Sequence, residues 1–328
     1  MKVLVTGATG FVGKAVIEDL LSESCEVKAL VRQSSESLPL IVEQVVVGDL
    51  ADFNLGHSGD LVRKAFTDVD VIVHAAARVH IMRDDIFDPL AQFRKVNRDA
   101  TLLLARLAAE SGIKRFVFLS SIKVNGENTR PGKPFTPDDV NIPDDPYGLS
   151  KYEAEQGLLS LAKETEIEVV IIRPPLVYGP GVKGNFYSIM KWMNKSLPLP
   201  FGAVENRRSL VALDNLVNLV SLCVDRNKSL KAANQVLLIS DGKDISTTHL
   251  LKKVGQAINF GSSPFTKAWL VPVPIGILLF FAKAAGKADV ANRLLGSLQV
   301  DMSKTHELLG WKPVVNIDEQ LAKMSKDF

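Results

Sequence analysis

Short apolar runs recur along the first half of the chain and are separated by longer stretches with helical periodicity. The runs show little apolar–polar alternation, which is typical of parallel strands that are buried on both faces. The clearest helical stretches, residues 89–111 and 147–163, lie between the later runs. Alternating strands and helices predict an α/β fold with a doubly wound parallel sheet. The runs occupy residues 3–5, 27–31, 45–47, 71–74, 116–120 and 169–173.

A glycine-rich turn joins the first predicted strand to a helix expected over residues 14–22. Gly7 permits a tight turn, Gly10 lets the backbone approach a pyrophosphate, and Gly13 lets the helix pack close to the sheet. The pyrophosphate would lie at the N-terminus of that helix, where unpaired N–H groups favour an anion. Because the required strand and helix flank the glycines, the motif predicts a Rossmann dinucleotide-binding domain.

The composition of the chain changes after Pro174 and Pro175, where predicted loops rich in Gly, Pro and Asn extend to about residue 210. A later strand-like run at residues 235–240 is expected to return to the main sheet. We therefore expect a Rossmann domain in residues 1–176, with 211–243 returning to it. Residues 177–210 and 244–328 would form a smaller, discontinuous substrate-binding lobe, with the ligand cleft at the carboxyl ends of the strands.

Tyr147 and Lys151 stand four residues apart in a predicted helix and therefore share one of its faces. An ammonium group close to a phenol stabilises the phenolate and lowers the pKa of the phenol, which would make Tyr147 a general acid/base. Beside a bound dinucleotide, such a pair predicts hydride transfer at a carbinol or carbonyl carbon. Ser120 and Ser121 end a predicted strand and place a hydroxyl at the same edge of the sheet.

The composition of the 328 residues is ordinary for a globular protein, with 46% hydrophobic and 23% charged residues. The net charge of +2 gives no indication of nucleic-acid binding. Cys25 and Cys223 show no metal-binding spacing, and we expect neither a metal site nor a disulfide. Because the first strand begins at residue 2, we expect no signal peptide and a cytoplasmic location. The apolar segment at residues 269–282 is too short to span a membrane, and we expect it to be a buried helix of the smaller lobe.

In these motifs the chain resembles the extended short-chain dehydrogenase/reductases, the superfamily of nucleotide-sugar epimerases, dehydratases and reductases. The resemblance covers nearly the whole chain. It implies a nucleotide sugar, linked to UDP, as substrate and a homodimer formed through the helices around residues 97–111 and 147–163. The matching segments are residues 6–13, 48–50, 74–77, 96–97, 120–121, the Tyr147/Lys151 pair, 173–174 and Arg207 with Asp214.

The resemblance also implies roles for single residues. The catalytic hydroxyl of the family precedes a Val-aromatic-Gly segment; here Asn125 replaces the aromatic residue before Gly126, and this register selects Ser121 as catalytic with Tyr147 and Lys151. Asp49 would contact the adenine amino group of the cofactor. Asn97 and His74 would have structural roles, and His80 would lie in a loop. The implied cofactor-binding residues are Gly7, Gly10, Phe11, Val12, Gly13, Arg32, Asp49, Leu50, Ala75, Ala76, Ala77, Tyr147, Lys151 and Pro174.

On the substrate side, Arg207 matches the Arg that grips the substrate diphosphate, where a guanidinium fork suits phosphate oxygens. The family often has Asn four places into its Arg-x-x-Asn segment, but this chain has Leu176 there. Substrate contact is therefore expected to shift to Asn185, and Ser121 would bond the reacting oxygen.

The end of the second predicted strand bears on the choice of cofactor. NAD-binding proteins usually place an acid there for the ribose 2′-hydroxyl, whereas an Arg suits a 2′-phosphate. Val31 occupies the acidic position and Arg32 follows it, which favours NADP(H) over NAD(H).

Ile122 and Lys123 follow Ser121, where dehydratases of the family carry an Asp-Glu pair, so sugar dehydration is disfavoured. Two reactions remain, and both use the same Ser, Tyr and Lys. NADP preference favours reduction of a 4-keto nucleotide sugar of the UDP-4-keto-6-deoxy-GlcNAc type. The sequence also resembles a bacterial subgroup of the family that acts in O-antigen and polysaccharide synthesis and includes reductases of this type. The alternative is a UDP-hexose or UDP-N-acetylhexosamine 4-epimerase with bound NAD. A non-catalytic NADP sensor is a third class, which the Tyr147/Lys151 pair disfavours.

Overall fold

A seven-stranded parallel sheet forms the centre of the computed structural model, which describes residues 1–54, 56–79, 88–139, 141–194, 198–258, 270–286 and 288–327. The strand order is β3-β2-β1-β4-β5-β6-β9. This order confirms the predicted doubly wound α/β fold, and β9 pairs with β6 as the late strand-like run suggests. The strands are β1 (Lys2–Thr6), β2 (Glu26–Val31), β3 (Glu43–Val46), β4 (Val71–His74), β5 (Arg115–Leu119), β6 (Glu168–Arg173) and β9 (Gln235–Leu238).

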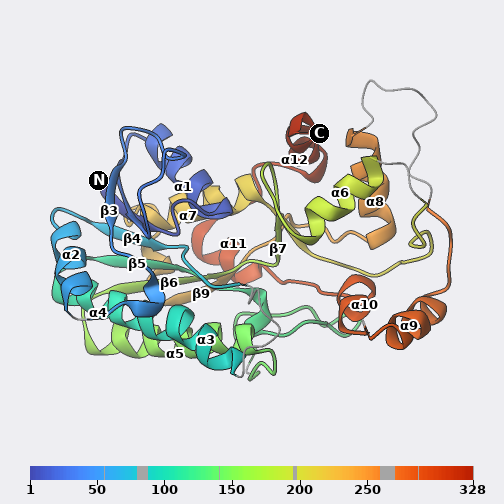
Figure 1. The fold of residues 1–328 in the computed structure, drawn as a ribbon, viewed down its shortest axis with the longest axis horizontal. Helices are drawn as coiled ribbons and strands as arrows, with labels where there is room; N and C mark the ends of the chain where they lie inside the picture. The colour runs from blue at the N-terminus through green and yellow to red at the C-terminus, as the bar shows by residue number, and fades with distance from the viewer. Residues whose placement is uncertain are drawn as a thin grey trace.

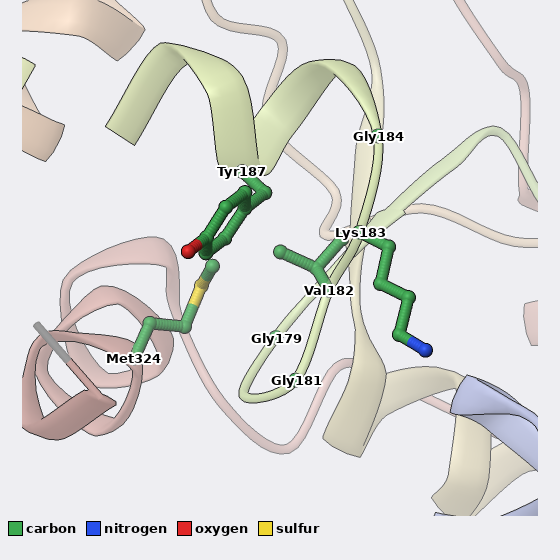
Figure 2. Close-up of a pocket in the computed structure, with 7 residues that line it drawn as sticks. All are labelled: Gly179, Gly181, Val182, Lys183, Gly184, Tyr187 and Met324. Atoms are coloured by element: carbon green, nitrogen blue, oxygen red, sulfur yellow. The ribbon is translucent and has the colours of Figure 1, made fainter. Parts of the chain in front are cut away.

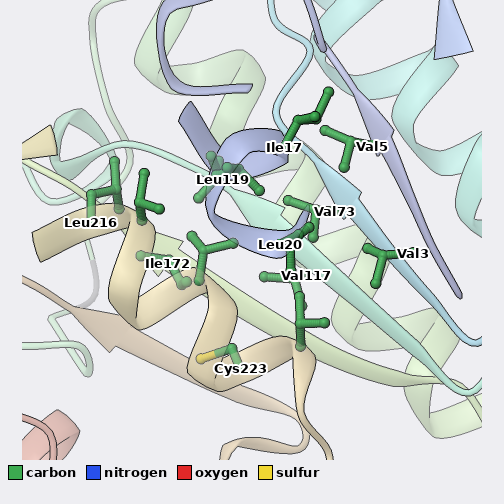
Figure 3. Close-up of a cluster of buried hydrophobic side chains, with 14 of the residues drawn as sticks. Val3, Val5, Ile17, Leu20, Val73, Val117, Leu119, Ile172, Leu216 and Cys223 are labelled. Atoms are coloured by element: carbon green, nitrogen blue, oxygen red, sulfur yellow. The ribbon is translucent and has the colours of Figure 1, made fainter. Parts of the chain in front are cut away.

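Helices cover both faces of the sheet (Figure 1), and successive residues of the central strands belong to different apolar clusters. Val3 and Val5 of β1 belong to the cluster that packs against α1 (Phe11–Ser22) and α7 (Leu213–Val224), as Figure 3 shows. Leu4 belongs to the opposite cluster, with α2 (His57–Ala65), α4 (Thr101–Glu110) and α5 (Pro146–Glu164). Because both faces of the central strands β1, β4, β5 and β6 are buried, these strands are largely apolar runs without alternation, whereas no residue of the edge strand β3 is buried.

The helical stretch predicted at residues 89–111 is interrupted. It consists of α3 (Pro89–Arg94), the wide π-helical turn η2 (Lys95–Ala100) and α4. The wide turn carries Asn97, which is fully buried. Short 3-10 helices occur at other places along the chain: η1 (Leu50–Asp52), η3 (Ile122–Val124) and η4 (Leu230–Ala232).

A second group of helices lies at the end of the molecule away from β3, as Figure 1 shows, together with the small parallel pair β7 (Leu176–Tyr178) and β8 (Leu210–Ala212). Tyr178, Phe186 and Leu251 belong to its own apolar core. The division of the chain into two lobes at residues 176, 210 and 243 stays a prediction. The helices are α6 (Asn185–Asn194), α8 (Thr247–Ile258), α9 (Ile275–Ala284), α10 (Ala288–Leu295), α12 (Ile317–Met324) and the 3-10 turn η5 (Ser325–Asp327). The helix α11 (Ser303–Leu309) instead packs beside β9 against the core of the main sheet.

The expectation that residues 269–282 form a buried helix is wrong for the described part of that segment. α9 begins at Ile275, and none of its residues is buried. Apolarity alone cannot reveal whether a neighbour covers a helix, and here only one side of α9 is covered. A search of the described residues finds no helix with the length and apolarity needed to cross a membrane. Trp269 and His80 lie outside the described residues.

Candidate functional site

The turn between β1 and α1 is shaped for glycine. Gly7 has a φ of +69°, and a Cβ on it would lie 2.6 Å from the backbone N of Ala76. A Cβ on Gly13 would lie 2.1 Å from the carbonyl oxygen of Gly7. Gly10 precedes α1 and, having no side chain, leaves the first N–H groups of the helix without a side-chain cap. With no acidic residue in the first turn of α1, this end of the helix fits a pyrophosphate.

The segment after β4 lies directly against this turn. Ala75 donates its N–H to the carbonyl of Thr6 over 3.2 Å, and Ala76 donates to the Thr6 hydroxyl over 3.3 Å. Asn97 accepts from the N–H of Arg78 over 2.8 Å and donates to the carbonyl of the same residue over 3.0 Å. The segment from Ala75 to Ala77 is thus tied down at both ends, and Asn97 has the backbone-bridging contacts that the resemblance implies.

His74 is a buried structural residue at the end of β4. Its ring nitrogens lie 2.8 Å from the hydroxyl oxygen of Thr6 and 2.9 Å from that of Thr101. Burial lowers the pKa of His74 to about 3, and the positive charge of Lys151 acts in the same direction.

His74→Gln is expected to make stability less sensitive to acid. Between pH 6.5 and pH 3 the unfolded chain binds a proton at His74 that the folded protein excludes. The free energy of unfolding therefore decreases as the pH is lowered through that window. The contribution is at most about 5 kcal/mol and is absent above the window. Urea unfolding at pH 8 and pH 4.5 measures it: the loss between the two pH values should be smaller in the variant than in the wild type. Equal losses would contradict a neutral buried imidazole.

The candidate catalytic hydroxyls meet where β5 leads into η3 and where α5 begins. Asp145 caps α5 by accepting the N–H of Gly148 over 2.8 Å, and Pro146 stands at the first position of the helix. The phenol of Tyr147 is hydrogen-bonded to the hydroxyl of Ser121. The Tyr147 ring also meets Phe93 edge-on, with 5.9 Å between the ring centroids. The structure therefore brings Ser121 and Tyr147 together.

Ser120 faces a different partner, since its hydroxyl donates to the carboxylate of the fully buried Glu155. This separation agrees with the selection of Ser121 for the substrate oxygen.

The pKa of Tyr147 is raised to about 12, which corrects the expectation that Lys151 lowers it. Burial is the largest cause, and the negative charge of Asp145 adds to it, while the hydrogen bond to Ser121 acts in the opposite direction. Lys151 instead donates its ammonium to the carbonyl of Leu119 over 2.8 Å and lies 4.2 Å from the ring centroid of Phe118. Burial lowers the pKa of Lys151 to about 7, and Glu155 opposes that shift. In this arrangement the phenol carries its proton at neutral pH.

A buried ion pair between Arg173 and Glu155 lies next to Ser120. Arg173, at the end of β6, donates to the Glu155 carboxylate with bonds of 2.6 to 3.1 Å and donates to the Asn125 side chain over 3.0 Å. The side chain of Glu155 is 0% exposed and that of Arg173 is 5% exposed. Glu155 is not among the site residues predicted from the sequence, although it continues the four-residue spacing of Tyr147 and Lys151 along one face of α5.

Residues expected at the adenosine end lie beyond β2 and β3. The side chain of Arg32 is 71% exposed, and its guanidinium nitrogen lies 3.8 Å from a carboxylate oxygen of Asp49. The other oxygen of Asp49 accepts the N–H of Ala51 over 2.8 Å and so caps η1, which begins at Leu50. The structure thus places Arg32, Asp49 and Leu50 close together, with Arg32 facing a carboxylate.

Backbone contacts place Pro174, an expected cofactor residue, and Arg207, an expected substrate residue, at the end of the sheet where Ser121 lies. The carbonyl of Pro174, which is expected to contact the cofactor, accepts the N–H of Ile122 over 3.0 Å, and this bond keeps Pro174 beside Ser121. Arg207 is exposed, and its carbonyl accepts the N–H of Leu298 over 2.8 Å. Because Leu298 packs against Ile122 in a small apolar cluster, Arg207 is carried to the same end of the sheet as Ser121. Asn185 begins α6.

A cavity of about 370 Å³ lies beside the start of α6 (Figure 2). Tyr187 and Met324 extend toward one another across it, whereas the side chain of Lys183 points away. The remaining lining residues are Gly179, Gly181, Val182 and Gly184. Since none of the predicted catalytic residues lines this cavity, it is separate from the Ser121/Tyr147 site. Among the described residues, no group of three or more His, Cys, Asp or Glu is placed to hold a metal ion.

Comparison with known proteins gives consistent matches. Residues 3–238 match the NAD dependent epimerase/dehydratase family. The chain is 44% identical over 328 residues to a UDP-glucose 4-epimerase of Vibrio cholerae, covering 99% of this chain and 95% of the relative. It is 28% identical to the N-acetyl-α-D-glucosaminyl-diphospho-ditrans,octacis-undecaprenol 4-epimerase of Escherichia coli O157:H7, covering 93% and 88% of the two chains. The crystal structure of a UDP-glucose 4-epimerase with UDP-glucose from Thermotoga maritima superposes with a TM-score of 0.76 at 24% identity, covering 99% and 98%.

Proposed function

The chain belongs to the NAD dependent epimerase/dehydratase family, and from this premise we propose that it interconverts UDP-linked hexoses that differ in configuration at C4. Membership makes it an NAD(P)-dependent enzyme of nucleotide-sugar chemistry. The finer proposal rests on one observation, the 44% identity over nearly the full length of a UDP-glucose 4-epimerase. The relatives thus favour the 4-epimerase, the alternative reading of the sequence, over the 4-keto reductase that Arg32 favours.

The glycine turn fits a dinucleotide because it holds no side chain that would fill the pyrophosphate position. Bound NAD supplies the acceptance and return of a hydride at C4 of the sugar. Gly7, Gly10 and Gly13 would hold its pyrophosphate, with Phe11 and Val12 at the start of α1. Asp49 and Leu50 would hold the adenine, and the backbone at Ala75, Ala76 and Ala77 and Pro174 would line the rest.

Tyr147 is the residue to which we assign the proton at the sugar O4 oxygen. Ser121, hydrogen-bonded to the same phenol, would orient that oxygen. Removing a proton from O4 requires the phenolate, whereas burial holds the pKa of Tyr147 at about 12. A cation must therefore stabilise the phenolate during the reaction, and Lys151, one turn along α5, is the residue we assign to it. Arg207 would bind the diphosphate, and Asn185 is proposed to contact the sugar nucleotide.

Incubating the purified protein with UDP-glucose or UDP-N-acetylglucosamine, without added cofactor, tests the reaction. Anion-exchange separation of the products should show the corresponding 4-epimers accumulating to equilibrium. The second candidate, an NADPH-dependent 4-keto reductase, is favoured by the position of Arg32 after β2. It would give no epimer and would instead consume NADPH stoichiometrically with a UDP-4-keto-6-deoxy-hexosamine.

The cofactor released from the protein by acid is expected to be NAD. Arg32 faces Asp49 at 3.8 Å, and a carboxylate at that distance disfavours a second anion such as a 2′-phosphate. Arg32 in the sequence suggests a preference for NADP(H). Identifying the cofactor released by acid, and titrating the protein with NADPH and NADH, tests that preference against the NAD proposal. Under the NAD proposal, Arg32→Asp leaves the preference for NADH in place. If Arg32 holds a 2′-phosphate, the wild type binds NADPH more tightly and the substitution reverses the order.

We expect a homodimer formed through α4 and α5, as in the superfamily that the sequence resembles. These two helices pack against each other, with Leu102 lying against Gly157. Light scattering at micromolar concentration should give twice the 35.8 kDa mass of the chain. A monomer at that concentration would contradict this expectation.

A further inference from the structure

α9 exposes large apolar side chains to solvent along most of its surface. Phe280 is 69% exposed, Phe281 is 65% exposed and Ile277 is 46% exposed. The rings of the two phenylalanines meet edge-on, with centroids 5.6 Å apart. An apolar helix that lies on a protein surface normally shows solvent a polar face, and α9 does not have one apart from Lys283.

The opposite side of α9 is anchored to the protein. Leu278 and Ala282, one helical turn apart, pack against a small cluster formed by Val204, Ala291 and Leu295. The anchored side holds the helix in place while Phe280 and Phe281 face outward. In Figure 1, α9 lies at the far end of the molecule from β3. A flat surface could therefore contact it without displacing the sheet or the Ser121/Tyr147 site.

The length of α9 excludes a membrane span. Its ten residues extend about 15 Å, and a span needs about 20 apolar residues. An apolar helix of this length with a polar end can instead lie in the plane of the boundary between lipid head groups and acyl chains.

The charges in and near α9 along the sequence indicate which surface it contacts. No Asp or Glu occurs between Asp244 and Asp289, whereas five lysines fall in this interval. Lys283 lies in the last turn of α9 and is exposed. α9 itself carries one cation and no anion, which complements acidic lipid head groups. Lys252 and Lys253 lie on α8, where Lys253 pairs with Asp318 at 2.6 Å, and Lys267 and Lys287 lie outside the described residues, so Lys283 is the lysine on which the proposal rests.

We propose that α9 docks the protein on the surface of a bilayer that contains anionic phospholipid. Phe280 and Phe281 enter the boundary between head groups and acyl chains, and Lys283 contacts phosphate groups. The docking is peripheral and reversible, because two aromatic side chains supply modest burial compared with a membrane span. It does not depend on which sugar is the substrate.

Flotation with vesicles tests this proposal on the full chain. Vesicles of phosphatidylglycerol and phosphatidylcholine in equal parts should carry the wild type to the top of a sucrose gradient, and vesicles of phosphatidylcholine alone should carry less. The double variant F280S/F281S should lower the bound fraction at least about tenfold. Lys283→Glu should weaken binding to the anionic vesicles. The matched control is L40S/I41S, which removes two exposed apolar residues, 105% and 78% exposed, from the turn before β3 and should bind like the wild type.

Circular dichroism and thermal unfolding confirm that each variant is folded, independently of any activity. Failure of the wild type to float would overturn the proposal, as would F280S/F281S floating like the wild type. Equal loss in L40S/I41S would also overturn it, because binding would then follow general surface apolarity. If light scattering shows that F280S/F281S breaks an assembly present in the wild type, a second copy covers α9 and the proposal is wrong.

Discussion

Tyr147→Phe is expected to lower kcat by about 10²–10⁴, the range of a positioned general acid/base. The substitution removes only the hydroxyl, so the ring keeps its edge-on contact with Phe93. The lost oxygen is the group that is hydrogen-bonded to Ser121, and it is the group to which we assign the proton of the sugar O4 oxygen. Steady-state rates with UDP-glucose measure the effect, and KM is expected to change much less than kcat.

The matched control for this variant is Tyr152→Phe, which makes the same chemical change five residues along α5. Tyr152 is half-buried and is not a predicted site residue. Its variant should keep wild-type kcat. Wild-type kcat in Tyr147→Phe would remove Tyr147 from the reaction, and an equal fall in both variants would indicate damage to α5 instead of lost chemistry.

Glu155→Gln is expected to destabilise the folded protein by about 3–5 kcal/mol, because it leaves the guanidinium of Arg173 buried without its counter-charge. Glu155 also accepts the hydroxyl of Ser120, so the substitution weakens a second buried bond. Urea unfolding monitored by circular dichroism gives the free energy of unfolding.

Glu164→Gln is the control for this change, since Glu164 ends the same helix and is exposed. It should alter stability by no more than about 0.5 kcal/mol. The double variant E155L/R173M, which removes both charges, should lose less than the two single variants added together. A loss below about 1 kcal/mol in Glu155→Gln would contradict the assigned role of the pair.

The sheet could be predicted from the sequence because its central strands β1, β4, β5 and β6 are buried on both faces. The residues of β1 and β4 are nearly all buried, and such runs leave a signal that needs no knowledge of the neighbours. The glycine turn was equally readable, since Gly7 and Gly13 stand where any Cβ would clash with backbone. The spacing of Tyr147 and Lys151 correctly placed them on one face of α5, and the register of Gly126 selected the serine that is hydrogen-bonded to Tyr147.

Properties that depend on the tertiary environment could not be predicted. The pKa of Tyr147 is set mainly by burial, and the ammonium of Lys151 is bonded to the Leu119 carbonyl, so the spacing gave the wrong direction for the phenol. The ion pair of Glu155 with Arg173 joins different elements of the fold. The exposure of α9 likewise could not be predicted from its apolar sequence, because only the packing of Leu278 and Ala282 in the structure shows which side of the helix is covered. The sequence also cannot separate epimerase from reductase, since both use Ser121, Tyr147 and Lys151.

The most direct test of the proposed 4-epimerase uses UDP-glucose that carries deuterium at C4, with the purified protein and no added cofactor. An enzyme that oxidises C4 and returns the same hydride to it converts the substrate to UDP-galactose with the deuterium still at C4, which mass spectrometry and NMR of the isolated product detect. We predict this product, with no net formation of reduced cofactor. The absence of UDP-galactose, or UDP-galactose that has lost the deuterium, would contradict the account.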